Sequence, residues 1–378
     1  MRILYCAMDQ TVPGTKGGSV HVTAVAEGLS DLGHEVHAIV SPGDGPFPDG
    51  RVNWIAMRPP FGAKQLRWAR RAAVEEMARA TGADVVMERY YNFAGEGIGA
   101  AKAVGAKAVL EVNAPVVDYP GSPKGMLDRA LIVRPMRRWR NRVCADADLI
   151  VSPSRGILPP ETPDSKVVEL EWGADTTRFT PESRLPPPYV RPAAIVAIFA
   201  GAFRSWHGAI HLARAIGELR QRGRSDIGAV FVGDGPELAR VKRAAADLDG
   251  VLFTGAVSHD RMPVHLTAGD VGVAPFDVSA HRALSLGFYW SPLKIFEYMA
   301  AGLPVVAPAV DRIPALVGNE REGLLYDPNR PGSLAATLER LADGALRQRL
   351  GRAARERAVR EYSWKAHCAR LADAIGKL

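Results

Sequence analysis

Short hydrophobic runs alternate with longer amphipathic segments along most of the chain. The runs are rich in Val, Ile and Ala, which is typical of strands buried on both faces, and the segments between them have helical spacing. This alternation predicts a parallel, doubly wound α/β sheet, because parallel strands are joined by crossover helices. In the first half, strands are predicted at Arg2–Met8, Glu35–Val40, Asp84–Arg89, Ala106–Asn113 and Asp148–Pro153, and helices at Gly18–Leu32, Ala63–Ala80 and Pro123–Ala145.

A proline-rich segment interrupts this pattern, which then starts again. Thr180–Pro192 contains too many prolines for a helix or a central strand, so residues 183–193 are predicted to be a linker. It separates two predicted domains, residues 1–182 and 194–363. In the second, strands are predicted at Ala194–Gly201, Gly228–Gly233, Val251–Gly255, Val271–Phe276, Pro304–Pro308 and Gly323–Asp327, before helices at Ser333–Ala342, Ala345–Tyr362 and Ser363–Leu378.

The segment Ser291–Pro308 carries the clearest candidate chemistry. Ser291 is a good N-cap and Pro292 suits the first helical position, so a helix is predicted to begin here. A helix start presents free N–H groups and partial positive charge, which suit a phosphate. Lys294 adds a cation, and Glu297, about one turn later, adds a carboxylate for ribose hydroxyls. An ordinary capped helix with an exposed Lys–Glu pair would have the same sequence.

This segment resembles the nucleotide-sugar-binding signature of retaining glycosyltransferases with the GT-B fold, family 4, in its Ser-Pro-x-Lys-x-x-Glu variant. Glu297 matches the second Glu of the family's E-x7-E motif, whereas Tyr289 stands at the position of the first. The resemblance implies two Rossmann-like domains facing a central cleft. Residues 1–182 would bind the acceptor and residues 194–363 the nucleotide sugar, while the C-terminal helix, 364–378, would cross back to the first domain.

A glycine loop, Thr15–His21, follows the first predicted strand. Gly17 and Gly18 let the backbone approach a phosphate or sugar without a Cβ clash, although a plain tight turn also explains them. The loop has neither P-loop nor dinucleotide-fingerprint spacing. It resembles the family 4 glycine loop, which implies contact with the donor. His21 either hydrogen-bonds a ligand or caps the loop.

Two predicted strands of the first domain end in polar residues, Glu88 and Arg89 in one strand and Glu111 and Asn113 in the other. These ends lie where the resemblance implies an acceptor. Many family members have a His there, and none occurs between Glu111 and Pro120 in this chain. We therefore expect Asn113 to take over contacts to donor or acceptor. For Glu88 and Glu111, an ion pair with Arg89 or another basic group is the alternative.

The loop Gly201–Gly208 follows the first strand of the second domain. It resembles the family's phosphate-binding loop, in which an Arg and a Lys-Gly grip the diphosphate. Arg204 is available for bidentate contacts, and His207 stands in place of the Lys. The resemblance implies that Arg204 and Lys294 stabilise the leaving phosphate, whereas an exposed loop arginine is the plainer interpretation of Arg204.

Other matches complete the implied donor site. The backbone near Val257 resembles the segment that pairs with the nucleobase, which leaves the base undetermined. Ser291, Pro292 and Leu293 form the start of the implied donor helix. Trp172–Pro181 resembles the family's Asn-Gly-Val-Asp-x-x-x-Phe-x-Pro segment and is interpreted as a hinge.

Composition limits the class of protein. The 378 residues suffice for two α/β domains, and 47% hydrophobic with 24% charged residues is typical of a soluble globular protein. The start of the chain is predicted to be a strand rather than a signal peptide. Cys6, Cys144 and Cys368 lack metal spacing and are expected to be reduced thiols in a cytoplasmic protein. The sequence contains no nucleic-acid-binding motif. It also indicates no metal site, because Asp146-Ala-Asp148 resembles a D-x-D motif only superficially.

A predicted basic amphipathic helix, Gly125–Ala145, adds one further expectation. Its arginines between Arg134 and Arg142 lie beside apolar residues that include Ile132, and Pro135 is expected to bend it. Such a helix can rest on the anionic inner face of a membrane or contact a lipid-linked acceptor. A solvated basic face over an apolar packing stripe is the alternative.

Together these motifs predict a retaining glycosyltransferase that moves a sugar from a nucleotide-diphosphate donor to a hydroxyl of a glycan, glycolipid or small molecule. No cofactor or nucleic acid is expected. No metal is expected either, because the resemblance implies that protein groups neutralise the leaving diphosphate, as in GT-B enzymes generally. Two alternatives stay open. Tyr289, His207 and the missing His suit a nucleotide-sugar-binding protein without transfer activity, and a GT-B epimerase or phosphorylase has the same fold. Neither half carries a dinucleotide fingerprint, which disfavours a dehydrogenase.

Overall fold

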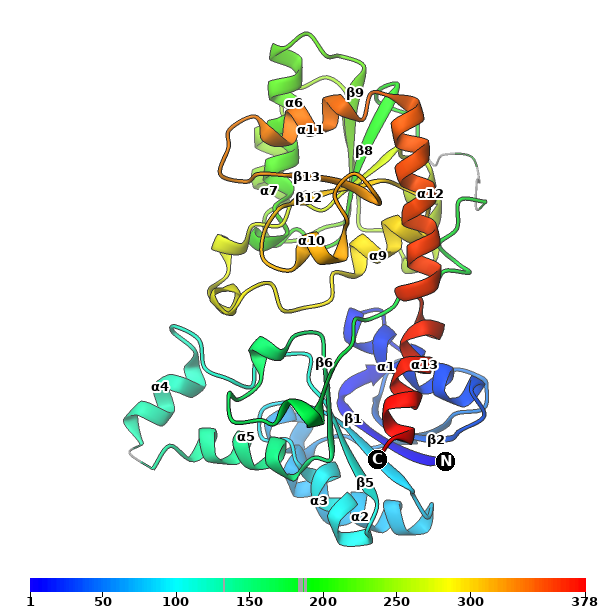
Figure 1. The fold of residues 1–378 in the computed structure, drawn as a ribbon, viewed down its shortest axis with the longest axis vertical. Coiled ribbons are helices and arrows are strands. Elements are labelled where there is room, and N and C mark those ends of the chain that lie inside the picture. Colours follow the sequence, from blue (N-terminus) through cyan, green and yellow to red (C-terminus); the bar gives the residue numbers. More distant parts are fainter. Residues whose placement is uncertain (132, 183–185, 187–188) are drawn as a thin grey trace. The chain divides into compact units, whose positions relative to one another are not determined.

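A computed structural model describes residues 1–131, 133–182, 186 and 189–378. The chain forms two compact units (Figure 1): unit 1 comprises Met1–Trp172, Tyr289–Ser291 and Trp364–Leu378, and unit 2 comprises Gly173–Phe288 and Pro292–Ser363. Ile132 of the predicted basic helix and residues 183–185 and 187–188 of the predicted linker lie outside the described residues. The chain leaves unit 1 after Trp172, before the predicted boundary at residue 182, and returns to it for residues 289–291.

Unit 1 contains a parallel sheet of seven strands in the order β3-β2-β1-β4-β5-β6-β7. The strands are β1 (Arg2–Val12), β2 (Glu35–Pro42), β3 (Asn53–Ala56), β4 (Val85–Arg89), β5 (Lys107–Glu111), β6 (Leu149–Ser152) and β7 (Val167–Glu169). The order runs in both directions from β1, which confirms the predicted doubly wound topology. The sequence pattern missed β3 and β7 because these short edge strands are only half-buried or exposed and lack a continuous apolar run.

The helices of unit 1 are α1 (Gly17–Asp31), α2 (Arg71–Ala80), α3 (Glu96–Val104), α4 (Pro123–Ala130), α5 (Pro135–Asp146) and α13 (Trp364–Gly376). The predicted helix at Ala63–Ala80 is wrong in its first part, where residues 64–70 form a 3-10 helix. The predicted single helix at Pro123–Ala145 is two helices. Pro135 disfavours a helical conformation at the preceding residue, and Arg134 has φ 45°. Asp128 then accepts hydrogen bonds from the first backbone N–H groups of α5.

The C-terminal helix α13 packs against α1 in unit 1, as the resemblance implied (Figure 1). Leu371 and Ile375 of α13 share one hydrophobic cluster with Val25 and Leu29 of α1. Cys368 is also buried, and its Sγ lies where a side chain on Gly28 would stand. The last helix therefore completes the core of the first unit although the whole of unit 2 precedes it in sequence.

Unit 2 contains a parallel sheet in the order β10-β9-β8-β11-β12-β13, and all six predicted strands are confirmed. The strands are β8 (Ile195–Ala200), β9 (Ile227–Val232), β10 (Val251–Gly255), β11 (Val271–Val273), β12 (Val305–Pro308) and β13 (Gly323–Tyr326). The helices are α6 (Ala209–Gln221), α7 (Leu238–Ala244), α8 (Met262–Thr267), α9 (Leu293–Ala300), α10 (Ile313–Leu316), α11 (Ser333–Arg340) and α12 (Gly344–Glu361).

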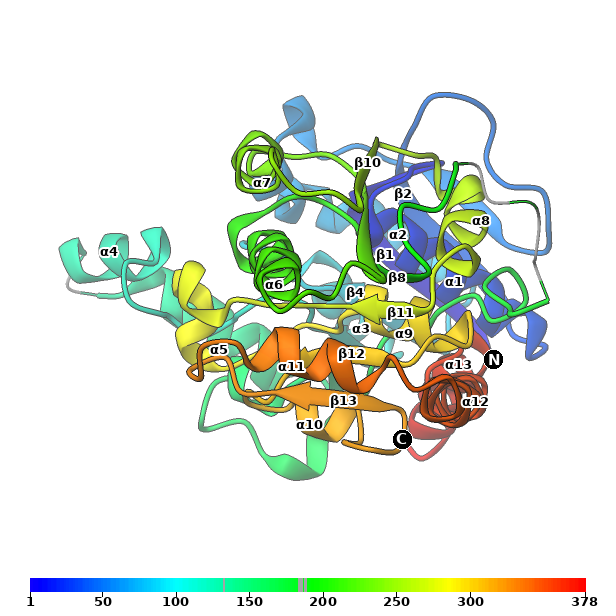
Figure 2. The ribbon, with the colours of Figure 1, turned by 90° about the horizontal axis from the view of Figure 1, so that it is seen from above.

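The two faces of this sheet carry different helices (Figure 2). Val271 and Val273 of β11 pack into the cluster that contains residues of α6 and α11. Gly272, between them, points to the other face, where a side chain on it would meet Tyr298 of α9. Helix α9 therefore lies on the face opposite α6, close to the central strands.

Candidate functional site

In unit 2, the loop after β8 approaches the first turn of α9. Gly201 begins this loop with φ 127°, a conformation that favours glycine. A Cβ at Gly201 would lie 3.5 Å from Nζ of Lys294. The carboxyl end of a parallel strand and the start of a helix therefore meet around one lysine, at the edge where such sheets bind anions.

Lys294 is a buried cation without a hydrogen-bond acceptor. Its side chain is only 9% exposed, and Nζ has no hydrogen-bond partner among the described residues. The amine lies 4.2 Å from the ring centroid of Phe199 and 5.3 Å from that of Phe276. Burial lowers the pKa of Lys294 to about 7, although the Glu297 carboxylate opposes this shift. A buried donor left unpaired is costly, so this arrangement favours binding of an anion beside Nζ.

The start of α9 differs from the prediction. Pro292, with φ −83° and ψ 80°, occupies the N-cap position, so the helix begins at Leu293. Ser291 is not the cap: its hydroxyl donates to Glu171 Oε2 at 2.6 Å and accepts from the backbone N–H of Trp172 at 3.0 Å, both in unit 1. Because Pro292 at the N-cap forms no side-chain cap, the first backbone N–H groups of α9 stay available for an anion.

The loop after β8 contains one exposed cation, Arg204, and one neutral ring, His207. Arg204 is exposed, with Cζ 5.9 Å from the Trp206 ring centroid. Nδ1 of His207 lies 2.5 Å from the carbonyl oxygen of Ala202, which indicates an Nδ1–H donor. Burial and the charge of Lys294 lower the pKa of His207 to about 3. His207 is therefore a neutral ring here and does not supply the charge of the lysine that it replaces.

Glu297 lies one turn after Lys294 and is 18% exposed. Its Oε1 is 3.5 Å from Nε2 of His259, a residue that the sequence analysis did not single out. Val257 precedes that histidine by two residues and is half-buried in the loop after β10. Lys294, Glu297 and Val257, predicted to contact phosphate, ribose and base, therefore all lie in unit 2. Of the other predicted donor residues, Gly17, Gly18 and Ser291 lie in unit 1.

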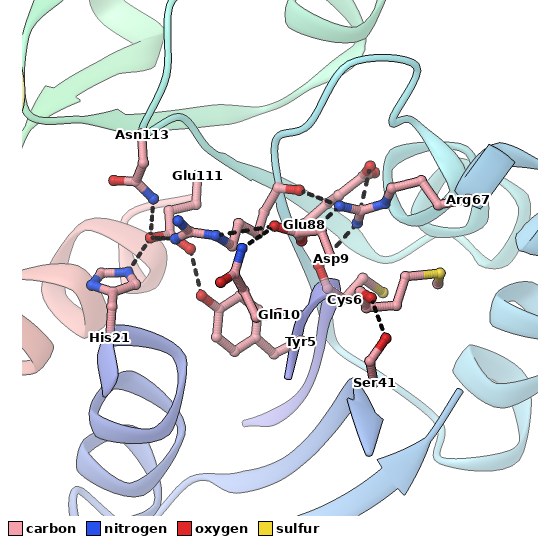
Figure 3. A network of polar contacts seen from close by, with 12 residues as sticks. Tyr5, Cys6, Asp9, Gln10, His21, Ser41, Arg67, Glu88, Glu111 and Asn113 are labelled. Atoms are coloured by element: carbon pink, nitrogen blue, oxygen red, sulfur yellow. Dashed lines mark hydrogen bonds and ion pairs between the residues drawn. The ribbon is translucent and has the colours of Figure 1, made fainter. Parts of the chain in front are cut away.

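In unit 1, Glu111 is the centre of a buried polar network (Figure 3). Its Oε2 accepts from the Tyr5 hydroxyl at 2.5 Å, and its Oε1 accepts from Nδ2 of Asn113 at 2.6 Å and contacts Nε2 of His21. Nη1 of Arg89 is 3.4 Å away. Burial alone would raise the pKa of Glu111, but contacts with His21, Arg89 and Tyr5 outweigh burial and lower this pKa below its usual value.

A second part of this network surrounds Arg67, which is fully buried (Figure 3). Its Nη1 donates to Asp9 at 2.8 Å, its Nε donates to Glu96, and its Nη2 lies 3.8 Å from Glu88. Glu88 accepts from the backbone N–H groups of Gly95 and Ile98 at 2.6 and 2.8 Å. Burial, with Glu96 nearby, raises the pKa of Glu88 to about 8.

Most of the residues predicted to contact an acceptor are bonded to other protein groups instead. His21, Glu88 and Glu111 are buried and bonded within the protein, so their side chains support the fold of unit 1. The alternative ion pair with Arg89 or another basic group is present for both residues, because Glu111 pairs with Arg89 and Glu88 pairs with Arg67. Asn113 is half-buried, and its Oδ1 accepts from the indole N–H of Trp172 at 2.7 Å.

The glycine loop opens α1. Gly17 is the first residue of that helix and is exposed, while a side chain on Gly18 would collide with Gln10. Within the described part of the chain, no group of three His, Cys, Asp or Glu residues is placed to hold a metal ion. Asp148 instead accepts a backbone hydrogen bond from Ala108.

Two family models of glycosyltransferases match the two halves of the chain. The model described as "Glycosyltransferase Family 4" matches residues 15–158, and "Glycosyl transferases group 1" matches residues 194–344. Solved structures share the fold over the full chain. Sucrose-phosphate synthase from Thermosynechococcus elongatus has a TM-score of 0.75 at 18% identity, covering 100% of this chain and 98% of that one. Anabaena HepE in complex with UDP-glucose has 0.69 at 18% identity, covering 100% of both chains.

The fold is therefore that of the GT-B glycosyltransferases. The chain belongs to the group 1, family 4 glycosyltransferases, whose two models match its two halves in order.

Sequence relatives lie in the same class. A GDP-mannose-dependent alpha-(1-6)-phosphatidylinositol monomannoside mannosyltransferase of Mycolicibacterium smegmatis is 28% identical over 246 residues, which are 62% of this chain and 63% of that protein. A 2-deoxystreptamine glucosyltransferase of Streptomyces kanamyceticus is 34% identical over 148 residues, 38% of this chain and 35% of that protein. The matched region thus spans less than two thirds of the length of either relative.

Proposed function

We propose that the protein is a retaining glycosyltransferase that uses a nucleotide-diphosphate-sugar donor and a hydroxyl-bearing acceptor. The observation that carries this proposal is Lys294, a buried amine with no hydrogen-bond partner in the described part of the chain, beside the start of α9. A diphosphate satisfies both groups at once. Relatives named for GDP-mannose and for glucosyl transfer support a nucleotide-sugar donor.

In this mechanism the acceptor hydroxyl attacks the anomeric carbon on the face that the diphosphate leaves. The departing phosphate oxygen takes the acceptor proton. Lys294, Arg204 and the first N–H groups of α9 stabilise the charge that grows on that phosphate. Glu297 binds the ribose hydroxyls. None of these steps uses a metal ion.

We expect one nucleotide sugar of a panel of UDP-, GDP-, ADP- and dTDP-sugars to be consumed and a new glycoside to form with an alcohol or glycan acceptor. Mass spectrometry detects the product, and NMR of the anomeric proton reports its configuration. Retention with activity preserved in EDTA is the expected result. Inversion, or activity lost in EDTA and restored by manganese or magnesium, contradicts the proposed mechanism.

The same panel separates the alternatives. Tyr289 and the neutral His207 favour a nucleotide-sugar-binding protein without transfer activity, whereas an epimerase or phosphorylase shares only the fold. Donor binding without turnover indicates a nucleotide-sugar-binding protein. An epimerised nucleotide sugar, or a sugar phosphate formed with inorganic phosphate, indicates an epimerase or a phosphorylase.

Donor binding is expected to take up a proton above pH 7. The Lys294 amine has a pKa of about 7 in the protein alone, and an adjacent diphosphate favours its charged form and raises that pKa. Affinity should therefore be constant below pH 7 and fall as the pH rises through the window between the two pKa values. Calorimetry in buffers of different ionisation enthalpy measures the uptake. Lys294→Met should abolish it, and equal heats in all buffers at pH 8 would contradict the expectation.

We also propose that a basic-apolar patch on α4, α5 and the described residues 131, 133 and 134 between them contacts an anionic membrane. Exposed apolar side chains there are Met126 (57%), Leu127 (47%), Leu131 (43%), Val133 (58%) and Trp139 (41%). Exposed arginines accompany them at positions 129, 134, 137, 138 and 142. Arg140 does not belong to this patch, because it is buried in ion pairs with Asp118 and Asp128. Among the described residues, no helix is long and apolar enough to cross a bilayer.

Liposome co-sedimentation tests this patch. The protein should bind vesicles containing phosphatidylglycerol at low salt and not those of phosphatidylcholine alone. Changing Arg137 and Arg138 to Gln should weaken binding roughly 10- to 30-fold, since each basic residue near such a surface contributes about 1 kcal/mol. The matched control changes Arg214 and Arg330, two exposed arginines of unit 2. No binding at low salt would leave a solvated basic face as the explanation.

A further inference from the structure

Of the segment Trp172–Pro181, interpreted from sequence as a hinge, residues Gly173–Pro181 lie in unit 2 and contain a turn at Asp175. Asp175 Oδ1 accepts from the backbone N–H groups of Thr177 and Arg178 at 3.0 Å each, and from the Thr177 hydroxyl at 2.6 Å. Phe179, the next residue, is 1% exposed, and its ring centroid is 5.5 Å from that of His259. The turn and the buried phenyl ring together fix the point from which the Arg178 side chain leaves.

Arg178 determines which nitrogen of His259 carries the proton. Its Nη1 is 3.0 Å from Nδ1 of His259, and its Nη2 pairs with Asp260. A guanidinium can only donate hydrogen bonds, so Nδ1 accepts and the proton of the neutral ring lies on Nε2. Nε2 in turn is 3.5 Å from Oε1 of Glu297, so this N–H points to the carboxylate.

We propose that Arg178 and His259 are positioning residues that orient Glu297 for the ribose of the donor. This inference rests on the proposed function, in which Glu297 binds ribose hydroxyls. One hydrogen bond from His259 restricts rotation of the carboxylate and leaves its other lone pairs for two vicinal hydroxyls. Hydrogen bonds from residues that do not themselves touch a ligand are known to fix the orientation of the groups that do. The segment interpreted as a hinge therefore also contributes, through Arg178, to recognition of the donor ribose.

The inference predicts discrimination between ribose and deoxyribose. Calorimetry would measure the Kd of UDP and 2′-deoxy-UDP, and of GDP and 2′-deoxy-GDP, with the wild-type protein and its variants. The ratio of deoxy to ribo Kd should be about tenfold or more in the wild type, because a hydrogen bond to a carboxylate is lost. His259→Phe should reduce this ratio about 3- to 10-fold, and Arg178→Met should reduce it less.

Conservative variants separate orientation from mere folding. His259→Gln keeps an acceptor for Arg178 and an N–H for Glu297, so it should retain most of the discrimination that His259→Phe loses. The matched control is His211→Phe. His211 pairs with Asp277 at 3.2 Å elsewhere in unit 2, and its loss should leave the ratio unchanged. Glu297→Gln should reduce the ratio, and adding His259→Phe to it should reduce it no further.

The outcomes distinguish the two proposals. If the wild type binds a ribonucleoside diphosphate and discriminates against its deoxy form, while His259→Phe and Arg178→Met keep the ratio, the positioning role is overturned and the proposed function stands. If the wild type binds none of the four nucleotides and also binds neither ADP nor dTDP, the donor site in unit 2 is wrong, and the positioning role falls with it.

Discussion

Replacing Lys294 with methionine is expected to lower turnover at saturating donor roughly 10²- to 10³-fold, the usual effect of losing one group that stabilises developing charge. Methionine fits the aliphatic space beside the Phe199 and Phe276 rings, so the substitution removes the charge with little loss of packing. Negative charge on the leaving phosphate increases toward the transition state. The effect on kcat should therefore exceed the effect on donor Kd.

Two further variants sharpen this prediction. Arg204→Ala should also lower turnover, and Arg204→Lys should restore it only in part, because an ammonium group cannot reproduce a bidentate fork. Lys242→Met is the matched control, since Nζ of Lys242 lies 5.7 Å from the Phe253 ring in the same unit without a role in the proposed site. Near-normal turnover in both Lys294→Met and Arg204→Ala would leave the N–H groups of α9 as the main phosphate contacts.

The second large effect concerns stability. Arg67→Met is expected to lower the free energy of unfolding of unit 1 by about 3–5 kcal/mol, because it leaves buried carboxylates without their cation. Asp9 and Glu96 lose direct hydrogen bonds, and Glu88 loses a nearby positive charge. Changing Glu96 to Gln in the same protein should recover part of the loss, since it removes one of the uncompensated charges.

Hydrogen exchange read by mass spectrometry measures this effect within a single molecule. Peptides from β1 and β4 of unit 1 should lose protection, while those from β8 of unit 2 serve as the internal reference. Arg2→Met is the matched control, because the Arg2–Asp84 pair is exposed, with side chains 49% and 45% accessible, and should contribute little. Unchanged protection in Arg67→Met would show that the buried cation is dispensable.

The sequence pattern predicted the two sheets well because their central strands are continuous apolar runs. Edge strands β3 and β7 have no such run, and the break between α4 and α5 depends on Arg134 at φ 45°. Pro135 indicated a bend, but only the tertiary contacts of Asp128 show that a new helix starts there. Local sequence therefore predicted which elements exist better than where they end.

For the candidate site, sequence identified residue types but not their environments. Lys294 was predicted as a phosphate contact, yet nothing local indicates that it is buried between two rings. Arg67 was missed because a buried arginine in a polar segment has the same local pattern as an exposed one. Its three carboxylates come from separate parts of the chain, Asp9, Glu88 and Glu96. His259 likewise depends on contacts with residues distant in sequence.

The chain passes between its two units at four peptide bonds, after residues 172, 288, 291 and 363. One of these passages divides the donor signature, since Ser291 is bonded to Glu171 and Trp172 while Pro292 leads into α9. A chimera of two related enzymes with one junction in the linker would therefore combine Ser291 of one parent with its partners from the other. A donor-domain transplant that keeps these contacts takes residues 1–172, 289–291 and 364–378 from the same parent.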